Sequence, residues 1–157
     1  EFRGATGPEQ RSKLGTARHQ SYFAALQTRP GCRCQSTDTC VPISRLAESI
    51  NDSIAEAEAS GIPYWIVGHV GDGNFHLSYL FDPDDPREAA EVERLNVKMV
   101  QRALRLEGTC TGEHGIGLHK MPYLLDEAGP AAVGAMRAIK QALDPKNIMN
   151  PGKIFVL

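Results

Sequence analysis

The stretch from residue 64 to residue 81, YWIVGHVGDGNFHLSYLF, decides the fold. Two runs of β-branched and aromatic residues, YWIVGHV (64–70) and FHLSYLF (75–81), predict strands. Between them lies GDGN (71–74), a cluster of residues that favour tight turns. The sequence therefore predicts a hairpin of two antiparallel strands with residues 71–74 at its tip.

Helical periodicity flanks this hairpin on both sides. Apolar residues recur at spacings of three and four in four segments, which predicts α-helices. These expected helices span residues 9–27, 42–61, 87–108 and 122–143, and the last one should be split at Gly129-Pro130. Helices around a small antiparallel sheet make the expected fold class α+β.

Two of these helices carry an apolar stripe that should face the core. The residues concerned are Val92, Leu95, Met99, Ala103 and Leu106 in the helix over 87–108, and Ile43, Leu46, Ile50 and Ile54 in the helix over 42–61. Residues 37–42 are expected to be extended. The Gly-rich segment TCTGEHGIGLHK, residues 109–120, is too irregular for a helix or a strand.

Composition excludes two classes of partner. The 17 basic and 19 acidic residues give a net charge of −2 with no basic stripe, so nucleic-acid binding is not expected. No run of about 18 apolar residues occurs, so no transmembrane segment is expected. The polar, Gly-rich start has no apolar core of a signal peptide and predicts an irregular segment over residues 1–13.

The four cysteines do not follow the paired spacing of a zinc ribbon. They are Cys32, Cys34, Cys40 and Cys110. Free thiols in a reducing compartment are the first interpretation, and a disulfide or a thiolate metal site is the alternative.

Two histidines lie in the predicted hairpin. With residues 71–74 at the tip, His69 faces His76, and directly opposed residues have Cβ atoms about 4.5–5.5 Å apart. Two such imidazoles can bind one ion at about 2.0–2.1 Å each, but a site needs a third ligand. The alternative is a pair of histidines that hydrogen-bond to the backbone of a half-buried sheet.

The pair Glu113-His114 is the best source of further chemistry. It lies between Gly112 and Gly115, and glycines allow the backbone to bend sharply near a ligand. A carboxylate can complete a metal site, and a neighbouring neutral imidazole can accept a proton from a hydroxyl. The alternative is a solvated turn. Asp72 is expected to be a turn residue, and His19 and His119 are expected at the surface.

Three strings resemble a known family. GHVGDGNFH, GTCTGEHGIG and the closing LDPKNIMNPGKIF look like the C-terminal region of FAD-linked 2-hydroxyacid dehydrogenases. The upstream string RPGCRCQSTDTCVPISRLAE is similar to the D-lactate dehydrogenase (cytochrome) type, with glycolate oxidase and D-2-hydroxyglutarate dehydrogenase as relatives. The resemblance covers residues 14–157 and implies one domain over this range, with a ferredoxin-like sheet of the FAD-linked oxidase C-terminal type.

The resemblance also implies roles for particular residues. It implies a divalent metal, zinc or else manganese or iron, and FAD as the cofactor. The implied metal ligands are His69, His76 and Glu113, the implied catalytic base is His114, the implied substrate-carboxylate clamp is Arg18, and the residues near the flavin are Asn150 and Lys153. Hydride would pass from the substrate's α-carbon to FAD while His114 takes the hydroxyl proton.

The resemblance favours D-lactate, oxidised to pyruvate, as the substrate. Dicarboxylate-using relatives carry polar groups where this chain has residues 35–37 and Ser78, and no second cation is evident there. Glycolate and 2-hydroxyglutarate remain alternative substrates. A different function class, a stand-alone α+β module with a structural metal, would need a fourth protein ligand such as Cys110.

The resemblance implies three partners: the small 2-hydroxy acid, a flavin-binding domain of the same protein, and a quinone or cytochrome as electron acceptor. No flavin-anchoring pattern occurs in the sequence, so the chain is expected to be a fragment that is inactive alone. The expected location is the cytoplasm with peripheral contact to a membrane, or the mitochondrion in a eukaryote.

Overall fold

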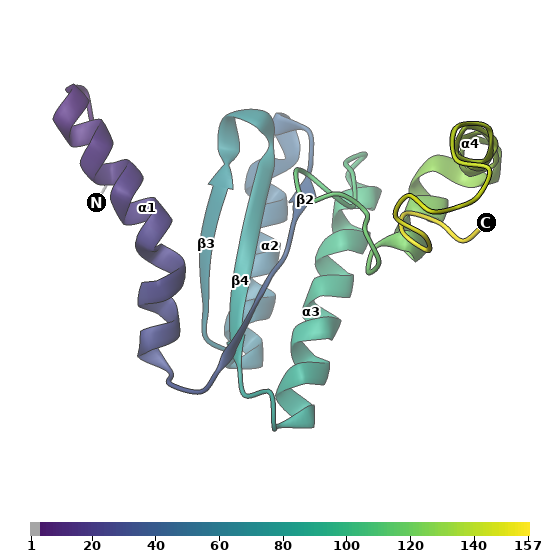
Figure 1. Ribbon diagram of the computed structural model, residues 1–157. Helices are drawn as coiled ribbons and strands as arrows, with labels where there is room; N and C mark the ends of the chain where they lie inside the picture. The colour runs from purple at the N-terminus through teal and green to yellow at the C-terminus, as the bar shows by residue number, and fades with distance from the viewer. Residues whose placement is uncertain (1–3) are drawn as a thin grey trace.

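The computed structural model describes residues 4–157 and confirms the expected α+β fold (Figure 1). Residues 1–3, part of the expected irregular segment 1–13, lie outside the described residues. The elements in chain order are α1 (Pro8–Thr28), β1 (Arg33–Ser36), β2 (Thr39–Cys40), α2 (Ile43–Ser60), β3 (Tyr64–His69), the 3₁₀ helix η1 (Val70–Asp72), β4 (Asn74–Phe81), α3 (Pro86–Arg105) and α4 (Met121–Leu143).

Strand β4 is the centre of the antiparallel sheet and pairs with all three other strands. Strand β3 pairs along one edge of β4, while β1 and β2 share the other edge. The extended segment therefore begins earlier than the predicted residue 37, and it is interrupted at Thr37 and Asp38. That interruption turns Asp38 out of the strand pairing, next to the loop that carries Glu113.

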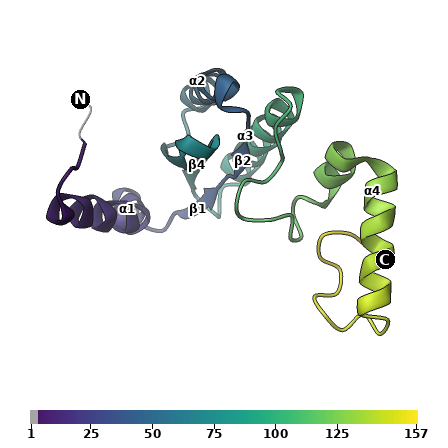
Figure 2. The same ribbon diagram turned by 90° about the horizontal axis from the view of Figure 1, so that it is seen from above.

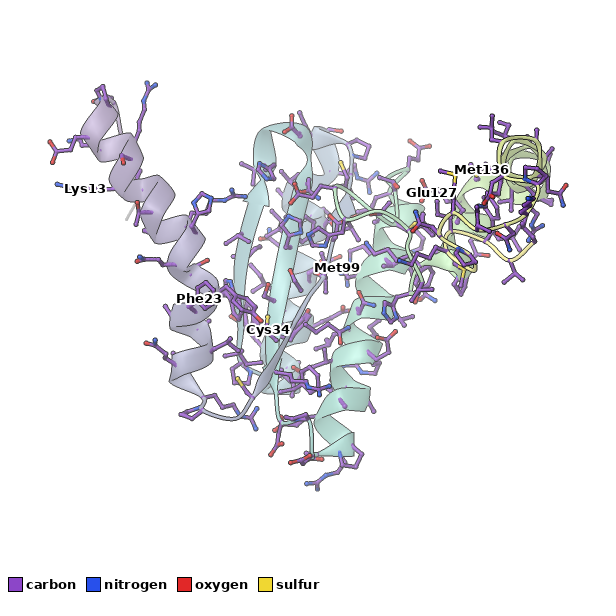
Figure 3. All side chains as sticks on the ribbon, in the orientation of Figure 1. Lys13, Phe23, Cys34, Met99, Glu127 and Met136 are labelled. Carbon is purple, nitrogen blue, oxygen red and sulfur yellow. The ribbon has the colours of Figure 1, made fainter. Side chains whose placement is uncertain are left out.

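Helices α2 and α3 cover one face of the sheet (Figure 1). Alternate residues of β4, namely Phe75, Leu77 and Tyr79, point into this interface and are buried. Met99 of α3, labelled in Figure 3, is buried between α3 and the sheet. Full burial of a large apolar side chain contributes about 1.5–3 kcal/mol, so these side chains hold the sheet against the helices.

The stripe predicted for α3 is confirmed, because Val92, Leu95, Met99, Ala103 and Leu106 are all buried. The stripe predicted for α2 is partly wrong. Ile43 is 65% exposed, and the residues that α2 buries are Ser49, Ser53 and Ala57. Small side chains at these positions let α2 approach its neighbours closely, and Ser53 Oγ satisfies its hydrogen bond on Ser49 O within the helix (2.7 Å).

Helices α1 and α4 lie at opposite ends of the molecule, as the view from above shows (Figure 2). None of the residues of α1 is buried. Its C-terminal end is attached by Arg29, which donates to Glu88 of α3 (Nη1 to Oε2, 2.7 Å). Helix α4 has the predicted break, because Gly129 has a non-helical backbone (φ 76°).

The segment over 109–120 is irregular as predicted, apart from one bridge between Thr109 and Cys40. All four cysteines are within the described residues and are free thiols. Among residues 4–157, each helix is too short or too polar to cross a lipid bilayer.

Candidate metal and substrate site

The hairpin forms as predicted, but its register differs from the prediction. The turn consists of η1 and Gly73, whose backbone is left-handed (φ 77°), and Asn74 already belongs to β4. His69 pairs with Asn74, and His76 pairs with Val67. The predicted pairing of His69 directly opposite His76 is therefore wrong.

Asn74 belongs to β4 and not to the turn, because its side chain forms hydrogen bonds with Asp38 and Thr39. Its amide nitrogen donates to Asp38 Oδ1 and to Thr39 O, both at 2.9 Å. The resulting register is two residues from the predicted one, and side chains along a strand alternate between faces. His69 and His76 therefore still share one face of the sheet, as diagonal neighbours.

His76 is buried, with 3% of its surface exposed. Its Nδ1 lies 2.9 Å from Thr37 O, and because a carbonyl oxygen only accepts, Nδ1 carries the ring proton. The other nitrogen, Nε2, then presents a lone pair, and this buried atom has no hydrogen-bond partner. A ring held in this way by its Nδ1 is oriented for metal binding through Nε2.

Glu113 brings a carboxylate to both histidines. Its Oε1 lies 3.0 Å from His76 Nε2, and its Oε2 lies 3.4 Å from His69 Nε2. Since the lone pair of His76 faces carboxylate oxygen, a cation between the two would satisfy both. Two atoms that each bind one ion at about 2.0–2.2 Å are roughly 3.0–3.6 Å apart, so the observed separations fit a shared ion.

His114 lies directly beside this group. Its ring stacks on the ring of His76, with centroids 4.9 Å apart and planes 10° apart. Its Nε2 is 4.0 Å from Glu113 Oε1. The side chain of His114 is 46% exposed, so it is accessible to a molecule bound at the site.

Arg18 reaches the site from α1. Its Nη2 lies 3.0 Å from His69 Nε2, and because a guanidinium only donates, His69 accepts at Nε2. Arg18 also lines a cavity of about 210 Å³. The other lining residues are His19, Ser21, Ser36, Val67, His76, Glu113 and His114. His19 and His119 are both exposed, as expected.

Sequence reasoning missed Asp38, which is 1% exposed at the interruption between β1 and β2. Its carboxylate accepts hydrogen bonds from the backbone N–H groups of Gly112, Glu113 and His114. Burial alone would raise the pKa of this carboxyl. The hydrogen bonds from Thr111, His114 and Glu113, together with the charge of Lys120, hold the pKa of Asp38 well below its usual range.

One oxygen or nitrogen from each of Asp38, His76 and His114 also lies within 4.8 Å of the others, which suggests a second possible ligand set. Asp38 is a poor metal ligand, however, because its oxygens already accept from the loop backbone and from Asn74. The set of His69, His76 and Glu113 is the better candidate, because the lone pair of His76 Nε2 meets no donor and that of His69 Nε2 accepts from the Arg18 guanidinium alone.

Asn150 and Lys153 are not part of this cluster. They line a separate cavity of about 460 Å³ together with Gly115 and Gly117 of the loop that carries Glu113. The tail is tied to this loop by a hydrogen bond from Ile154 N to Gly117 O (2.8 Å). Residues of the loop that carries Glu113 therefore line both cavities.

A comparison with protein families gives one decisive match: the family model described as FAD linked oxidases, C-terminal domain, matches residues 1–154. The chain belongs to this family. The resemblance inferred from the sequence motifs is confirmed, and so is the expected fold.

Curated relatives include D-lactate dehydrogenases. The chain is 48% identical to a probable mitochondrial D-lactate dehydrogenase of Danio rerio, over 100% of this chain and 32% of the relative. It is 46% identical to the mitochondrial D-lactate dehydrogenase (cytochrome) of Arabidopsis thaliana, over 99% of this chain and 27% of the relative. The chain thus spans about a third or less of the length of these relatives.

Two further comparisons match this chain, one in sequence and one in structure. A glycolate oxidase subunit of Bacillus subtilis is 37% identical over 94% of this chain and 31% of the relative. The solved structure of 4-ethylphenol oxidase from Gulosibacter chungangensis, in complex with isoeugenol, matches with a TM-score of 0.63 and 18% identity, over 97% of this chain and 31% of that one. This structural match supports the fold alone.

Proposed function

We propose that this chain is the substrate- and metal-binding domain of a flavin-dependent dehydrogenase that oxidises a D-2-hydroxy acid, D-lactate, to pyruvate. One observation carries the proposal: His69, His76 and Glu113 converge beside a cavity that Arg18 and His114 line. The D-lactate dehydrogenases among its relatives support the choice of reaction.

The proposed metal ligands are His69 Nε2, His76 Nε2 and the Glu113 carboxylate. The buried, partnerless Nε2 of His76 supports this choice, since an unpaired polar atom in the interior is costly. A set of two imidazoles and one carboxylate suits zinc, manganese or iron. Three protein ligands leave a coordination position for a substrate, as in catalytic sites.

A cation held by His69, His76 and Glu113 would supply a positive charge that polarises the hydroxyl and carboxylate groups of the substrate, and FAD would supply the acceptor for the hydride equivalent of the α-carbon. We place the flavin mainly in a flavin-binding domain of the same protein, with the domain over residues 14–157 closing the site. Asn150 and Lys153 are proposed to contact it, because they line the cavity beside Gly115 and Gly117.

Within this domain, His114 and Arg18 have distinct tasks. His114 Nε2 takes the proton of the substrate hydroxyl, so that one proton and one hydride leave D-lactate and pyruvate remains. Arg18 binds the substrate carboxylate through its fork of N–H donors. A cation at His69 would repel the guanidinium from its present contact with Nε2 and free it for this task.

The lining of the cavity favours a small monocarboxylate. Among residues 4–157, Arg18 is the one permanent cation that lines this cavity, and Ser21, Ser36 and Val67 offer none for a second carboxylate. Glycolate is the first alternative substrate, supported by the similarity to a glycolate oxidase subunit, and 2-hydroxyglutarate is the second.

The proposed electron acceptor is a cytochrome or a quinone, and the proposed location in a eukaryote is the mitochondrion, in line with the names of the relatives. The alternative of a purely structural metal finds no support at Cys110. This residue is buried, and its backbone and side chain are hydrogen-bonded to Glu127 of α4, labelled in Figure 3.

The proposal is tested with the flavin-loaded full-length protein. His114→Ala is expected to lower kcat for D-lactate by about 10²–10⁴-fold while the metal content is retained, because proton transfer contributes on this scale. His69→Ala is expected to lower the metal content measured by elemental analysis. His119→Ala, an exposed histidine outside both cavities, serves as the matched control.

The substrate is decided by a panel of D-lactate, glycolate and D-2-hydroxyglutarate. The highest kcat/KM is expected for D-lactate. Unchanged oxidation of D-lactate by His114→Ala would show that the assigned base is wrong, and an equal metal content in His69→Ala and in the unaltered protein would remove His69 from the ligand set.

A further inference from the structure

We propose that Asp38 is the positioning residue that sets Glu113 and His114 in place. The inference rests on the proposed function for the roles of those two side chains. Asp38 lies at the interruption between β1 and β2, 75 and 76 positions before Glu113 and His114 in the chain. It makes no hydrogen bond with the ring of His76 or of His114.

The first argument is the number of donors around the Asp38 carboxylate. A carboxylate offers about four lone-pair sites. Six donors reach the two oxygens of Asp38: Asn74 Nδ2 (2.9 Å), Thr111 Oγ1 (2.7 Å), Gly112 N (2.8 Å), Glu113 N (3.1 Å), His114 N (3.0 Å) and Lys120 Nζ (3.3 Å). The carboxylate is thus fully used within the protein, and its role is to organise these donors.

The second argument is where the donors come from. Three consecutive backbone N–H groups, those of residues 112–114, point at one buried carboxylate. This fixes the backbone at the two residues that carry the proposed ligand and the proposed base. The backbone N–H groups of Glu113 and His114 point inward to Asp38. In this arrangement the side chain of Glu113 reaches His76, and the ring of His114 stacks on the ring of His76.

The third argument is that the same carboxylate holds both ends of the loop. Thr111 and Gly112 at its start bind Asp38, and Lys120 at its end donates to Asp38 O (2.6 Å) and Oδ2. Between these anchors lie Gly115 and Gly117, both with left-handed backbone. The hydrogen bond from Ile154 N to Gly117 O holds the middle of the loop, and Asp38 restrains both of its ends.

The test uses Asp38→Asn in the flavin-loaded full-length protein, before and after removal of metal with a chelator. Asparagine keeps the shape but places an NH₂ group among donors, so the backbone N–H groups of residues 112–114 lose an acceptor. In the metal-free protein, hydrogen exchange of these three amides should become faster by roughly tenfold or more. The dissociation constant for Mn²⁺, used as the probe, should rise about 10–100-fold with an altered EPR spectrum.

Glu56→Gln is the matched control. This variant also loses a partly buried ion pair, the one between Glu56 of α2 and Arg102 of α3 (2.7 Å), but the pair is away from the loop. It should lower the unfolding midpoint without changing either readout at the loop. If Asp38→Asn does not fold, Thr111→Val removes one donor only, and severalfold faster exchange of the same amides is expected.

The two proposals fail separately. If the unaltered protein binds no Mn²⁺ or Zn²⁺, the metal assignment fails, while the hydrogen-exchange comparison still decides the role of Asp38. Asp38 does not position the loop if exchange of the 112–114 amides in Asp38→Asn stays within twofold of the unaltered protein. Where Asp38→Asn does not fold, the same criterion applies to Thr111→Val.

Discussion

At the scale of single residues, Gly112 leaves no room for a side chain. A Cβ atom added there would lie 1.8 Å from Asn74 Nδ2 and 2.8 Å from Asp38 Oδ1. The side chain of Asn74 cannot move aside freely, because it binds both Asp38 and Thr39 O. The absence of a side chain at Gly112 therefore lets the loop lie against β4.

Gly112→Ala is expected to destabilise the protein by about 1–3 kcal/mol, the usual cost of overpacking, and to lower its metal content as Glu113 is displaced. Denaturant unfolding and elemental analysis measure the two effects. Gly134→Ala is the control: its Cβ would meet nothing within 4 Å, and alanine favours a helix over glycine. Equal behaviour of the two variants would contradict the proposed contact.

At the scale of elements, periodic patterns were predictable and long-range contacts were not. The stripe of α3 was predicted because Val92, Leu95 and Met99 follow a clear 3.6-residue period. The buried face of α2 was missed because serine does not look like a core residue, although Ser53 is satisfied by its own helix.

The same contrast applies to the site. His69, His76 and Glu113 were predictable as a group, since their residue types carry metal chemistry and the hairpin places the two histidines on one face. Asp38 gave no local signal, because its role depends on contacts with a loop more than 70 residues away. The turn was misplaced for a related reason: Asn74 looks like a turn residue until its amide is seen to bind Asp38.

The contact between α2 and α3 is expected to depend on Arg102. This residue is 5% exposed and donates from Nη1 to Ser53 Oγ (2.7 Å), while its Nη2 lies 2.7 Å from Glu56 Oε2. Arg102→Met is expected to cost about 2–4 kcal/mol in denaturant unfolding, because it removes the nearer and buried partner of the Glu56 carboxylate together with the hydrogen bond to Ser53.

Lys98→Met is the control for this contact. Lys98 pairs with the same Glu56 at 3.4 Å but is much more exposed, so its loss should cost less than about 1 kcal/mol. A larger loss for Lys98→Met than for Arg102→Met would contradict the assigned importance of the buried pair.

At the scale of the whole molecule, stability is concentrated in the centre. Strand β4, α2 and α3 share the main apolar core, while α1 buries none of its residues. The side chains of Tyr79 and Cys110 are buried in this central region or at its border, and both have raised pKa values. Burial raises the pKa of the Tyr79 hydroxyl from 10.0 to about 12 and the pKa of the Cys110 thiol from 9.0 to about 12.

These raised pKa values predict a loss of stability at alkaline pH. Above pH 9 to 10 the unfolded chain releases both protons while the folded protein keeps them, so the unfolded state binds fewer protons and is favoured. The free energy of unfolding should fall by up to about 1.4 kcal/mol per pH unit and group until pH approaches 12. Denaturant unfolding between pH 8 and 11 measures this, and Cys110→Ala should flatten the curve above pH 9.

The turn between β3 and β4 has a consequence for how this hairpin can change in length. Moving the strand pairing by two residues leaves both histidines on the same face, whereas moving it by one would send His69 to the opposite face. Insertions or deletions in the paired part of β4 before His76 should therefore obey an even–odd rule, whereas residues added to the turn can leave the pairing unchanged. Relatives and engineered variants that add or remove an even number of residues here can keep both imidazoles on the glutamate, and odd changes require a bulge to restore them.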